Sequence, residues 1–197
     1  MNLEYKEHLP QEFSPQSRIW IYQASRMFTI TEAFELEDLL KEFIQNWKSH
    51  GDDVTGYANL FFGRFIIIIA DESQTGVGGC STDSSVRFVK SIEQKFNTEM
   101  FNRQLLAFIV KDKIELIPLS QLEYAFAKGF INENTLYFNN TVLTLEALNS
   151  QWIVPVKESW LATKLPPIAI NFFKPFFLLV YSQKNICCTR RLKYRQN

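Results

Sequence analysis

The sequence predicts an α+β domain with a ferredoxin-like βαββαβ core and a C-terminal β-α elaboration. Three observations lead to this prediction. Strand-like apolar runs and helical periodicities follow one another in the order β-α-β-β-α-β up to residue 110. Right-handed crossover connections leave few other ways to arrange that order. The length of 197 residues also suits a single domain.

The first strand and the first helix are predicted over residues 18–51. Residues 18–23 form a short apolar and aromatic run that is typical of a strand. Thr29 and Glu32 fit a capping box, in which each side chain binds the backbone of the other residue, so a helix should begin there. A buried helical stripe follows, and Gly51 stands where a left-handed cap would end the helix. The stripe consists of Leu36, Leu39, Leu40, Phe43, Ile44 and Trp47.

A hairpin supplies the next two strands. Residues 55–62 and 64–71 are extended segments that are joined at Gly63 in a tight turn. Residues 65–70 are apolar without interruption, as is expected of a strand that is covered on both faces. We therefore expect this strand to lie in the middle of the sheet.

A second helix and a second hairpin complete the core. The helix is predicted over residues 83–97, after a glycine-rich turn, and Asp83 is favourably placed at its positive end. Residues 105–110 and 114–118 form the hairpin. The apolar stripe of the helix consists of Val86, Val89, Ile92 and Phe96.

The elaboration is predicted over residues 120–164, packed on the same sheet. A helix at residues 120–128 ends at Gly129, a short strand lies near residues 136–138, and Thr144 begins another helix.

Composition divides the chain into a polar leader at residues 1–16, a single α+β domain at 17–164 and an apolar, basic tail at 165–197. Six of the 21 Lys and Arg residues, and none of the 21 acidic residues, fall in the tail. Residues 1–164 therefore carry a net charge of −6, which argues against a nucleic-acid partner. We expect the tail to be atypical, either poorly ordered or non-native.

The tail contains an apolar run at residues 168–181, which Lys174 and Pro175 interrupt. The run is shorter than the roughly 20 residues that a membrane-spanning helix needs, and it lacks helical amphipathicity. Membrane association is therefore expected only if the tail is native. The N-terminus lacks the features of a secretory signal, and the three cysteines are badly spaced for a disulfide framework. We expect a cytoplasmic protein with reduced thiols.

The glycine-rich turn at residues 76–83 is the best candidate for a functional site. It does not match a P-loop, because no lysine follows its glycines to meet the phosphates of a nucleotide. Ser81 stands in place of the last glycine of a dinucleotide fingerprint, and Val86 in place of the arginine of a phosphatase loop. The sequence therefore does not support ATP hydrolysis of the P-loop type.

Free N–H groups at the start of a helix can still bind an anion or lower the pKa of a neighbouring thiol, here Cys80. The candidate ligand-binding residues are Gly78, Gly79, Ser81, Thr82 and Asp83.

The predicted core places His50 beside Cys80, because its first helix ends at the sheet edge where its second helix begins. Asp71 and Glu72 belong to the same edge, together with Asp52 and Asp53. These groups suggest a Cys80-based enzyme or redox switch, with His50 as base and Asp71 or Glu72 orienting it.

A purely structural interpretation also stays open. Cysteine is often buried inertly, and glycines serve to turn the chain. Ser81 or Thr82 can simply cap the helix, and His50 can be a solvated residue at a helix C-terminus. Asp71 and Glu72 can mark the solvated end of a strand.

Neither a metal nor a cofactor is predicted. With His8 and His50 as its histidines, the chain has no Cys/His set with the spacing of a zinc site, and the acids near the predicted edge lack a calcium-loop signature. Aromatic side chains offer a different hypothesis, a docking patch for a protein partner, unless they belong to the core. These are Tyr137, Phe138, Trp152 and Trp160.

Several segments together resemble an uncharacterised bacterial family that is often labelled "ABC transporter ATPase". The resemblance covers about residues 17–164, and it implies membership in a family without a known activity. The matching segments are residues 47–51, 59–65, 71–73, 79–86, 118–120, 138–140 and 159–160. Members of the family end near residue 164, so the tail is a departure from its pattern.

These observations favour a non-catalytic cytoplasmic domain, with a role in regulation or in binding an unknown protein partner or a small ligand. A small homo-oligomer is compatible with this function. The alternative is the enzyme or redox switch built on Cys80, His50 and Asp71 or Glu72.

Overall fold

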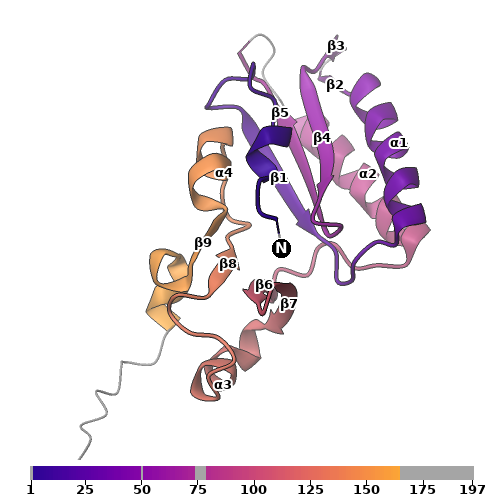
Figure 1. Cartoon of the computed structure of the whole chain (residues 1–197). Coiled ribbons are helices and arrows are strands. Elements are labelled where there is room, and N and C mark those ends of the chain that lie inside the picture. Colours follow the sequence, from indigo (N-terminus) through magenta and orange to yellow (C-terminus); the bar gives the residue numbers. More distant parts are fainter. Residues whose placement is uncertain (1, 50, 74–78, 165–197) are drawn as a thin grey trace, which may run out of the picture. The chain divides into compact units, whose positions relative to one another are not determined.

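The computed structural model describes residues 2–49, 51–73 and 79–164, and it shows a mixed α/β domain with several small sheets (Figure 1). The first sheet has the order β1-β5-β4 and consists of β1 (Arg18–Gln23), β4 (Gly56–Phe61) and β5 (Phe65–Ala70). Both neighbouring pairs are antiparallel. As predicted, β5 is the middle strand, and all six of its residues are buried.

The two faces of β5 belong to different hydrophobic clusters, which explains its uninterrupted apolar sequence. Ile66 and Ile68 pack with α1 (Ile30–Gln45) and α2 (Gly79–Phe96), which lie on one face of the sheet (Figure 1). Ile67 and Ile69 point to the other face and join the second cluster.

The second cluster is closed by the N-terminal segment and by α4 (Leu145–Gln151). Tyr5, in the 3-10 helix Tyr5–His8, is buried against Trp152, and its hydroxyl donates to the Leu148 carbonyl at 2.7 Å. Burial raises the pKa of Tyr5 to about 12. The leader therefore contributes to the hydrophobic core.

The capping box at the start of α1 is confirmed. Glu32 N donates to Thr29 Oγ1 at 3.3 Å, and Thr29 N donates to Glu32 Oε2 at 2.8 Å. Arg26 adds a link to the other helix, because its guanidinium pairs with the Glu32 carboxylate and donates to the Phe96 carbonyl at the end of α2. The start of α1 and the end of α2 are thereby tied together.

The predicted end of the first helix is wrong. Helix α1 ends at Gln45, and a small antiparallel pair of β2 (Lys48–Ser49) and β3 (Asp52–Asp53) follows. Gly51, with φ of 101°, lies between these two strands rather than at a helix cap. Asn46 takes the cap position, and its side chain donates to the Glu42 carbonyl at 2.8 Å.

The strand order does not confirm the ferredoxin-like sheet. The predicted fourth strand, β6 (Leu105–Val110), belongs to a second sheet of order β7-β6-β8-β9. We expected the elaboration to pack on the first sheet; its helix α4 does so, whereas its strands belong to the second sheet. The other strands of the second sheet are β7 (Lys113–Pro118), β8 (Leu136–Phe138) and β9 (Ile153–Pro155).

Two physical reasons account for this correction. Strand β6 is paired on both sides, with β7 and with β8. The outer edge of β1 is also occupied, because Ile19 N donates to the Leu143 carbonyl at 3.1 Å and Leu145 N donates to the Ser17 carbonyl at 2.9 Å.

Helix α3 (Leu122–Ala127) covers the second sheet, and Gly129 follows it with φ of 67°. Thr144 caps α4, as predicted, since its hydroxyl accepts from Ala147 N at 3.2 Å. No helix among the described residues is long and apolar enough to cross a membrane. The tail at 165–197 lies outside the described residues.

Candidate functional site

The end of α1 and the start of α2 lie side by side, as the sequence predicts. The indole Nε1 of Trp47, just after α1, donates a hydrogen bond of 3.0 Å to Ser84 Oγ in the second turn of α2. The two helices therefore meet at one edge of the domain.

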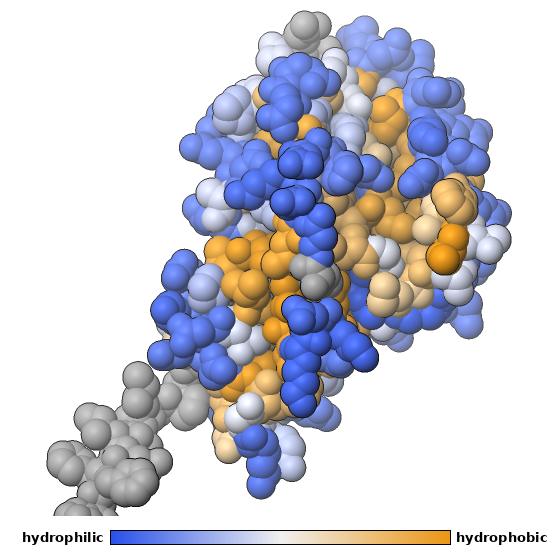
Figure 2. Space-filling model, in the orientation of Figure 1, coloured by the Kyte–Doolittle hydropathy of each residue, from blue (hydrophilic) through white to orange (hydrophobic). Residues whose placement is uncertain are grey.

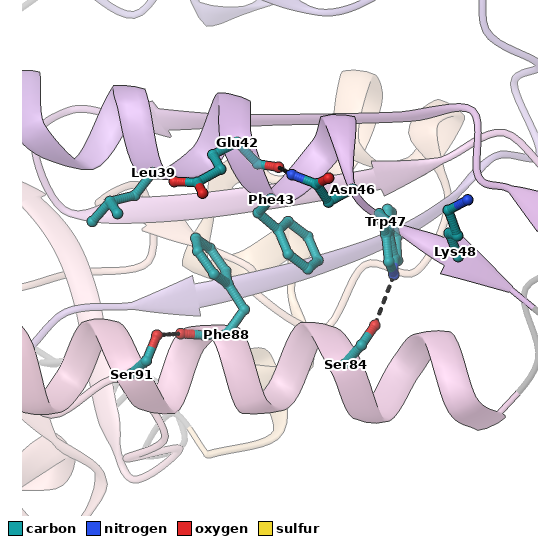
Figure 3. A pocket seen from close by; sticks show the side chains of 9 residues that line it. All are labelled: Leu39, Glu42, Phe43, Asn46, Trp47, Lys48, Ser84, Phe88 and Ser91. Carbon is teal, nitrogen blue, oxygen red and sulfur yellow. Dashed lines mark hydrogen bonds between the residues drawn. The ribbon is translucent and has the colours of Figure 1, made fainter.

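A groove of about 560 Å³ runs along the seam between these helices (Figure 3). Its volume is within the usual range for small-molecule sites. Leu39, Glu42, Phe43, Asn46, Trp47 and Lys48 line it from α1 and the residues that follow, and Ser84, Phe88 and Ser91 line it from α2.

The floor of the groove is aromatic. Figure 3 shows the Phe43 and Phe88 rings between the two helices, where they stack with centroids 4.4 Å apart and planes inclined by 14°. Trp47 extends this row, with its ring centroid 5.3 Å from that of Phe43. Trp20 of β1 supports Trp47 from inside the domain, in an edge-on contact at 5.9 Å. Such pairs hold their rings in defined positions.

The position of Trp47 depends on a glycine in β4. A Cβ at Gly56 would lie 2.8 Å from Trp47 Cε3 and 3.2 Å from Ile44 Cδ1, closer than ordinary van der Waals contact. Glycine therefore lets the indole pack directly on the strand. The same indole is 2% exposed and is oriented by its hydrogen bond to Ser84.

Polar groups lie at the rim of the groove. Ser91 Oγ donates to the Phe88 carbonyl at 2.6 Å, and Asn46 caps α1 as described above. Lys48 Nζ lies 3.4 Å from Asp53 Oδ1, and both side chains are mostly exposed. An exposed ion pair of this kind costs little to separate, so the Lys48 ammonium can turn toward a ligand in the groove.

Several residues of the predicted thiol site fall outside the described part of the chain. Gly78 and His50 lie outside the described residues, as do the side chains of Cys80 and Ser81, so the Cys80–His50 pair stays a prediction. The backbone of Cys80 belongs to the first turn of α2.

The remaining ligand candidates of the turn lie at the start of α2. Gly79 is exposed at the start of α2, Asp83 is exposed and Thr82 is half-buried. None of these three residues is among those that line the groove.

The structure separates the predicted carboxylates by burial. Asp71 directly follows β5 and is buried, and its Oδ1 accepts from Ser73 N at 3.1 Å and from Ser17 Oγ at 3.4 Å. Glu72, Asp52 and Asp53 are exposed. Asp71 thus fixes the end of a strand, and it is not one of the groove-lining residues.

The hypothesis of an aromatic docking patch is wrong for three of its four residues. Tyr137, Phe138 and Trp152 are at most 2% exposed, and burial raises the pKa of Tyr137. Trp160 is 39% exposed and donates from Nε1 to the Tyr137 hydroxyl at 3.3 Å. Trp152 and Phe138 belong to the core that joins the two larger sheets.

Sequence reasoning assigned Phe43 and Trp47 to the buried stripe and did not consider Phe88. A signal was present in α2, where Ser84, Phe88 and Ser91 are spaced by four and three residues and therefore share one helical face. A row of serines around one phenylalanine is less apolar than a core stripe, and it marks the partly solvated wall of the groove.

Comparisons with models of protein families, with curated proteins and with solved structures find no match to this chain. Within the described ranges, no three His, Cys, Asp or Glu side chains are grouped so that they could hold a metal ion.

Proposed function

We propose that this chain is a non-catalytic binding domain, and that the groove between α1 and α2 holds a small molecule with a flat apolar ring and an anionic group. The observation that carries the proposal is the aromatic floor of Phe43, Trp47 and Phe88, in which the half-buried rings of Phe43 and Phe88 lie beside polar groups and pack with the buried Trp47. Small-molecule sites typically combine apolar and aromatic walls with a few polar groups that fix the orientation of the ligand.

The charges at the rim favour an anionic group at one end of the ligand. Lys48 lies in β2, three residues after the end of α1, and its ammonium is paired with the exposed carboxylate of Asp53. Glu42 lies one helical turn before Asn46, so an anion is expected to bind at the Lys48 end of the groove.

The polar groups of the groove favour binding over catalysis. Ser84 Oγ accepts a hydrogen bond from the Trp47 indole N–H and thereby holds the ring that lines the groove. Asp71 is not among the described residues that line the groove. The thiol enzyme therefore remains a separate hypothesis about the glycine-rich turn.

The fold predicted from the sequence is proposed here for only part of the domain, and the predicted family remains a proposal. The order β1-β5-β4 is that of three of the four strands in a ferredoxin-like sheet, and α1 and α2 lie on one face of it. We propose a ferredoxin-like origin for that part alone. Membership in the bacterial family, and a place in the cytoplasm, are likewise proposals that rest on the sequence.

The test is a fluorescence titration of the full chain with 8-anilinonaphthalene-1-sulfonate, a planar molecule with one anionic group. At about −0.3 kcal/mol for each of its roughly 21 non-hydrogen atoms, binding amounts to about −6 kcal/mol, or a Kd of a few tens of micromolar. We expect saturation with one molecule per chain and quenching of Trp47.

Three variants assign this binding to the groove. Phe88→Ser removes the stacked ring and should weaken binding about tenfold, which corresponds to about 1.4 kcal/mol. Lys48→Gln should weaken binding of the sulfonate about threefold. Tyr124→Ser, at a 67% exposed aromatic residue on α3, is the matched control and should change nothing. Equal affinity in Phe88→Ser and the unmodified chain would refute the proposal.

A further inference from the structure

The strand edges of this domain differ in how they are protected against pairing. The outer edge of β1 is covered by residues 143–145, as described above. In the second sheet, the edge strand β7 carries Lys113, Glu115 and Pro118, and the edge strand β9 ends at Pro155. Charges, prolines and covering segments are the usual means by which proteins block an open edge.

The edge strand β4 has none of these features. Its sequence Gly56–Phe61 contains neither a charged residue nor a proline, and in the described part of the chain it pairs with β5 alone. Leu60 N donates to Asn59 Oδ1 at 2.8 Å rather than to β5. Because backbone groups alternate along an antiparallel strand, those of Ala58 and Leu60 point outward.

Apolar side chains lie next to this edge. Figure 2 shows a hydrophobic surface that runs between β4 and α1. Met27, Ile30 and Phe34 are exposed at the start of α1, by 55%, 78% and 64%. Exposed apolar groups that flank an unprotected edge mark an interaction surface.

Helix α1 runs along β4 in the opposite direction. At one end of β4, a Cβ on Gly56 would meet Trp47 and Ile44, and just beyond the other end a Cβ on Gly63 would meet Met27 at 3.4 Å. With a rise of about 3.3 Å per residue in a strand and 1.5 Å in a helix, the middle of β4 lies beside α1 near Leu39.

This alignment makes the surface complementary to itself. If two copies of β4 pair antiparallel about a twofold axis at the middle of the strand, their α1 helices also lie antiparallel, centred near Leu39. Glu37 and Lys41, which lie 4.0 Å apart as an ion pair within α1, are equidistant from that centre and have opposite charges, so Glu37 of one copy lies level with Lys41 of the other. Phe34 and Ile44 are also equidistant, and both are apolar.

We infer that β4 pairs with β4 of a second copy of this chain, which forms a continuous six-stranded sheet with α1 against α1. The pairing uses the outward backbone groups of Ala58 and Leu60, and it covers Phe34. A closed twofold interface of this kind leaves no further open β4 edge. The inference concerns a different surface from the ligand groove and does not depend on it.

The test is the molar mass of the full chain by light scattering, between about 5 and 200 μM, with hydrogen exchange measured in parallel. We expect twice the chain mass of 23.1 kDa at the higher concentrations. We also expect exchange of the Ala58 amide to slow as the dimer forms, because it becomes hydrogen-bonded to the other copy, whereas the Leu60 amide already donates to Asn59 Oδ1 in one copy. A monomer throughout this range overturns the inference.

Two variants locate the interface. Ala58→Pro removes an outward N–H that β5 does not use, and Phe34→Glu places a charge in the apolar contact. Each should raise the dimer dissociation constant at least tenfold. Gln121→Lys, at an exposed residue near α3, should leave it unchanged. If Ala58→Pro does not fold, the dimer dissociation constant of Phe34→Glu alone tests the interface. Phe34 is already exposed, so a charged side chain at this position is compatible with folding. A folded variant of either kind that still dimerises as tightly as the unmodified chain shows that another surface is used.

Discussion

Replacing Gly56 with alanine tests how the groove is built. The new Cβ would lie 2.8 Å from Trp47 Cε3, 3.0 Å from Cζ3 and 3.2 Å from Ile44 Cδ1, whereas ordinary contact begins at 3.4 Å. The indole must therefore retreat by about 0.6 Å, against the support of Trp20 and the hydrogen bond to Ser84. Overpacking of this kind costs about 1–3 kcal/mol.

The net effect combines three contributions. Weakening the hydrogen bond between Trp47 and Ser84 adds about 1 kcal/mol to the cost, and the smaller conformational freedom of alanine in the unfolded chain recovers about 0.5 kcal/mol. We expect Gly56→Ala to lower the free energy of unfolding by about 2 kcal/mol. With a urea m-value of about 2 kcal/mol/M, the midpoint falls by about 1 M.

The assay is urea unfolding followed by circular dichroism and tryptophan fluorescence. Gly79→Ala is the matched control, because nothing lies within 4 Å of its added Cβ and the residue begins a helix. Alanine there should keep or raise the stability, by up to about 1 kcal/mol. If Gly56→Ala and Gly79→Ala unfold at the same urea concentration, the account of how Trp47 is held is wrong.

Two further predictions concern charge and the thiol. Hydrogen bonds from Arg26 and from the backbone at Thr29 lower the pKa of Glu32 to about 2, so its stabilising effect is complete above about pH 4.5 and is lost as the pH falls through about 2. The difference in urea midpoint between the unmodified chain and Glu32→Gln should therefore be largest near pH 6 and shrink below pH 4.5; a constant difference contradicts the pairing with Arg26. For Cys80, alkylation rates across pH in the full chain carrying Cys187→Ser and Cys188→Ser should report an ordinary thiol, with an apparent pKa near 8.5 or no labelling while folded. An apparent pKa below about 7 would instead favour the enzyme or redox switch.

Local signals in the sequence predicted the elements of the first sheet well. The capping box of Thr29 and Glu32, the turn at Gly63 and the buried run of β5 depend on residues that are close in the chain. Their physical causes act over a few residues, so the pattern alone is sufficient. The same reasoning correctly predicted that α1 and α2 lie on one side and meet at one end.

Contacts between distant segments caused the errors. The sequence of β6 suits either sheet. Its pairing with β8 and the position of Leu143 to Leu145, more than 30 residues away, keep it from the edge of β1. Trp47 continues the apolar stripe of α1 in the sequence. The pattern therefore does not distinguish a last residue of the helix from a residue beyond the helix that packs on Gly56. A close approach between a side chain and a strand leaves no periodic signal.

The candidate site shows the same difference between local signals, which the sequence reveals, and contacts between distant segments, which it does not. The sequence singled out the glycine-rich turn, because thiols, imidazoles and glycines have recognisable chemistry, and that prediction stays untested. The groove between α1 and α2 is built from Phe43 and Phe88. Aromatic residues at helical spacing are indistinguishable from core residues in the sequence, because the groove forms only where the two helices pack together.

The central claim is that the groove between α1 and α2 binds a planar anionic molecule. The most direct measurement is a ¹H–¹⁵N NMR titration of the full chain with 8-anilinonaphthalene-1-sulfonate, in which the four indole N–H signals are assigned by single Trp→Phe variants. The signal of Trp47 should shift and saturate, because its ring lines the groove, while those of Trp152 and Trp160 should remain in place. In Phe88→Ser, half of the shift should be reached only at an about tenfold higher concentration of the ligand. A titration that moves the Trp160 signal and leaves the Trp47 signal unchanged would contradict the claim.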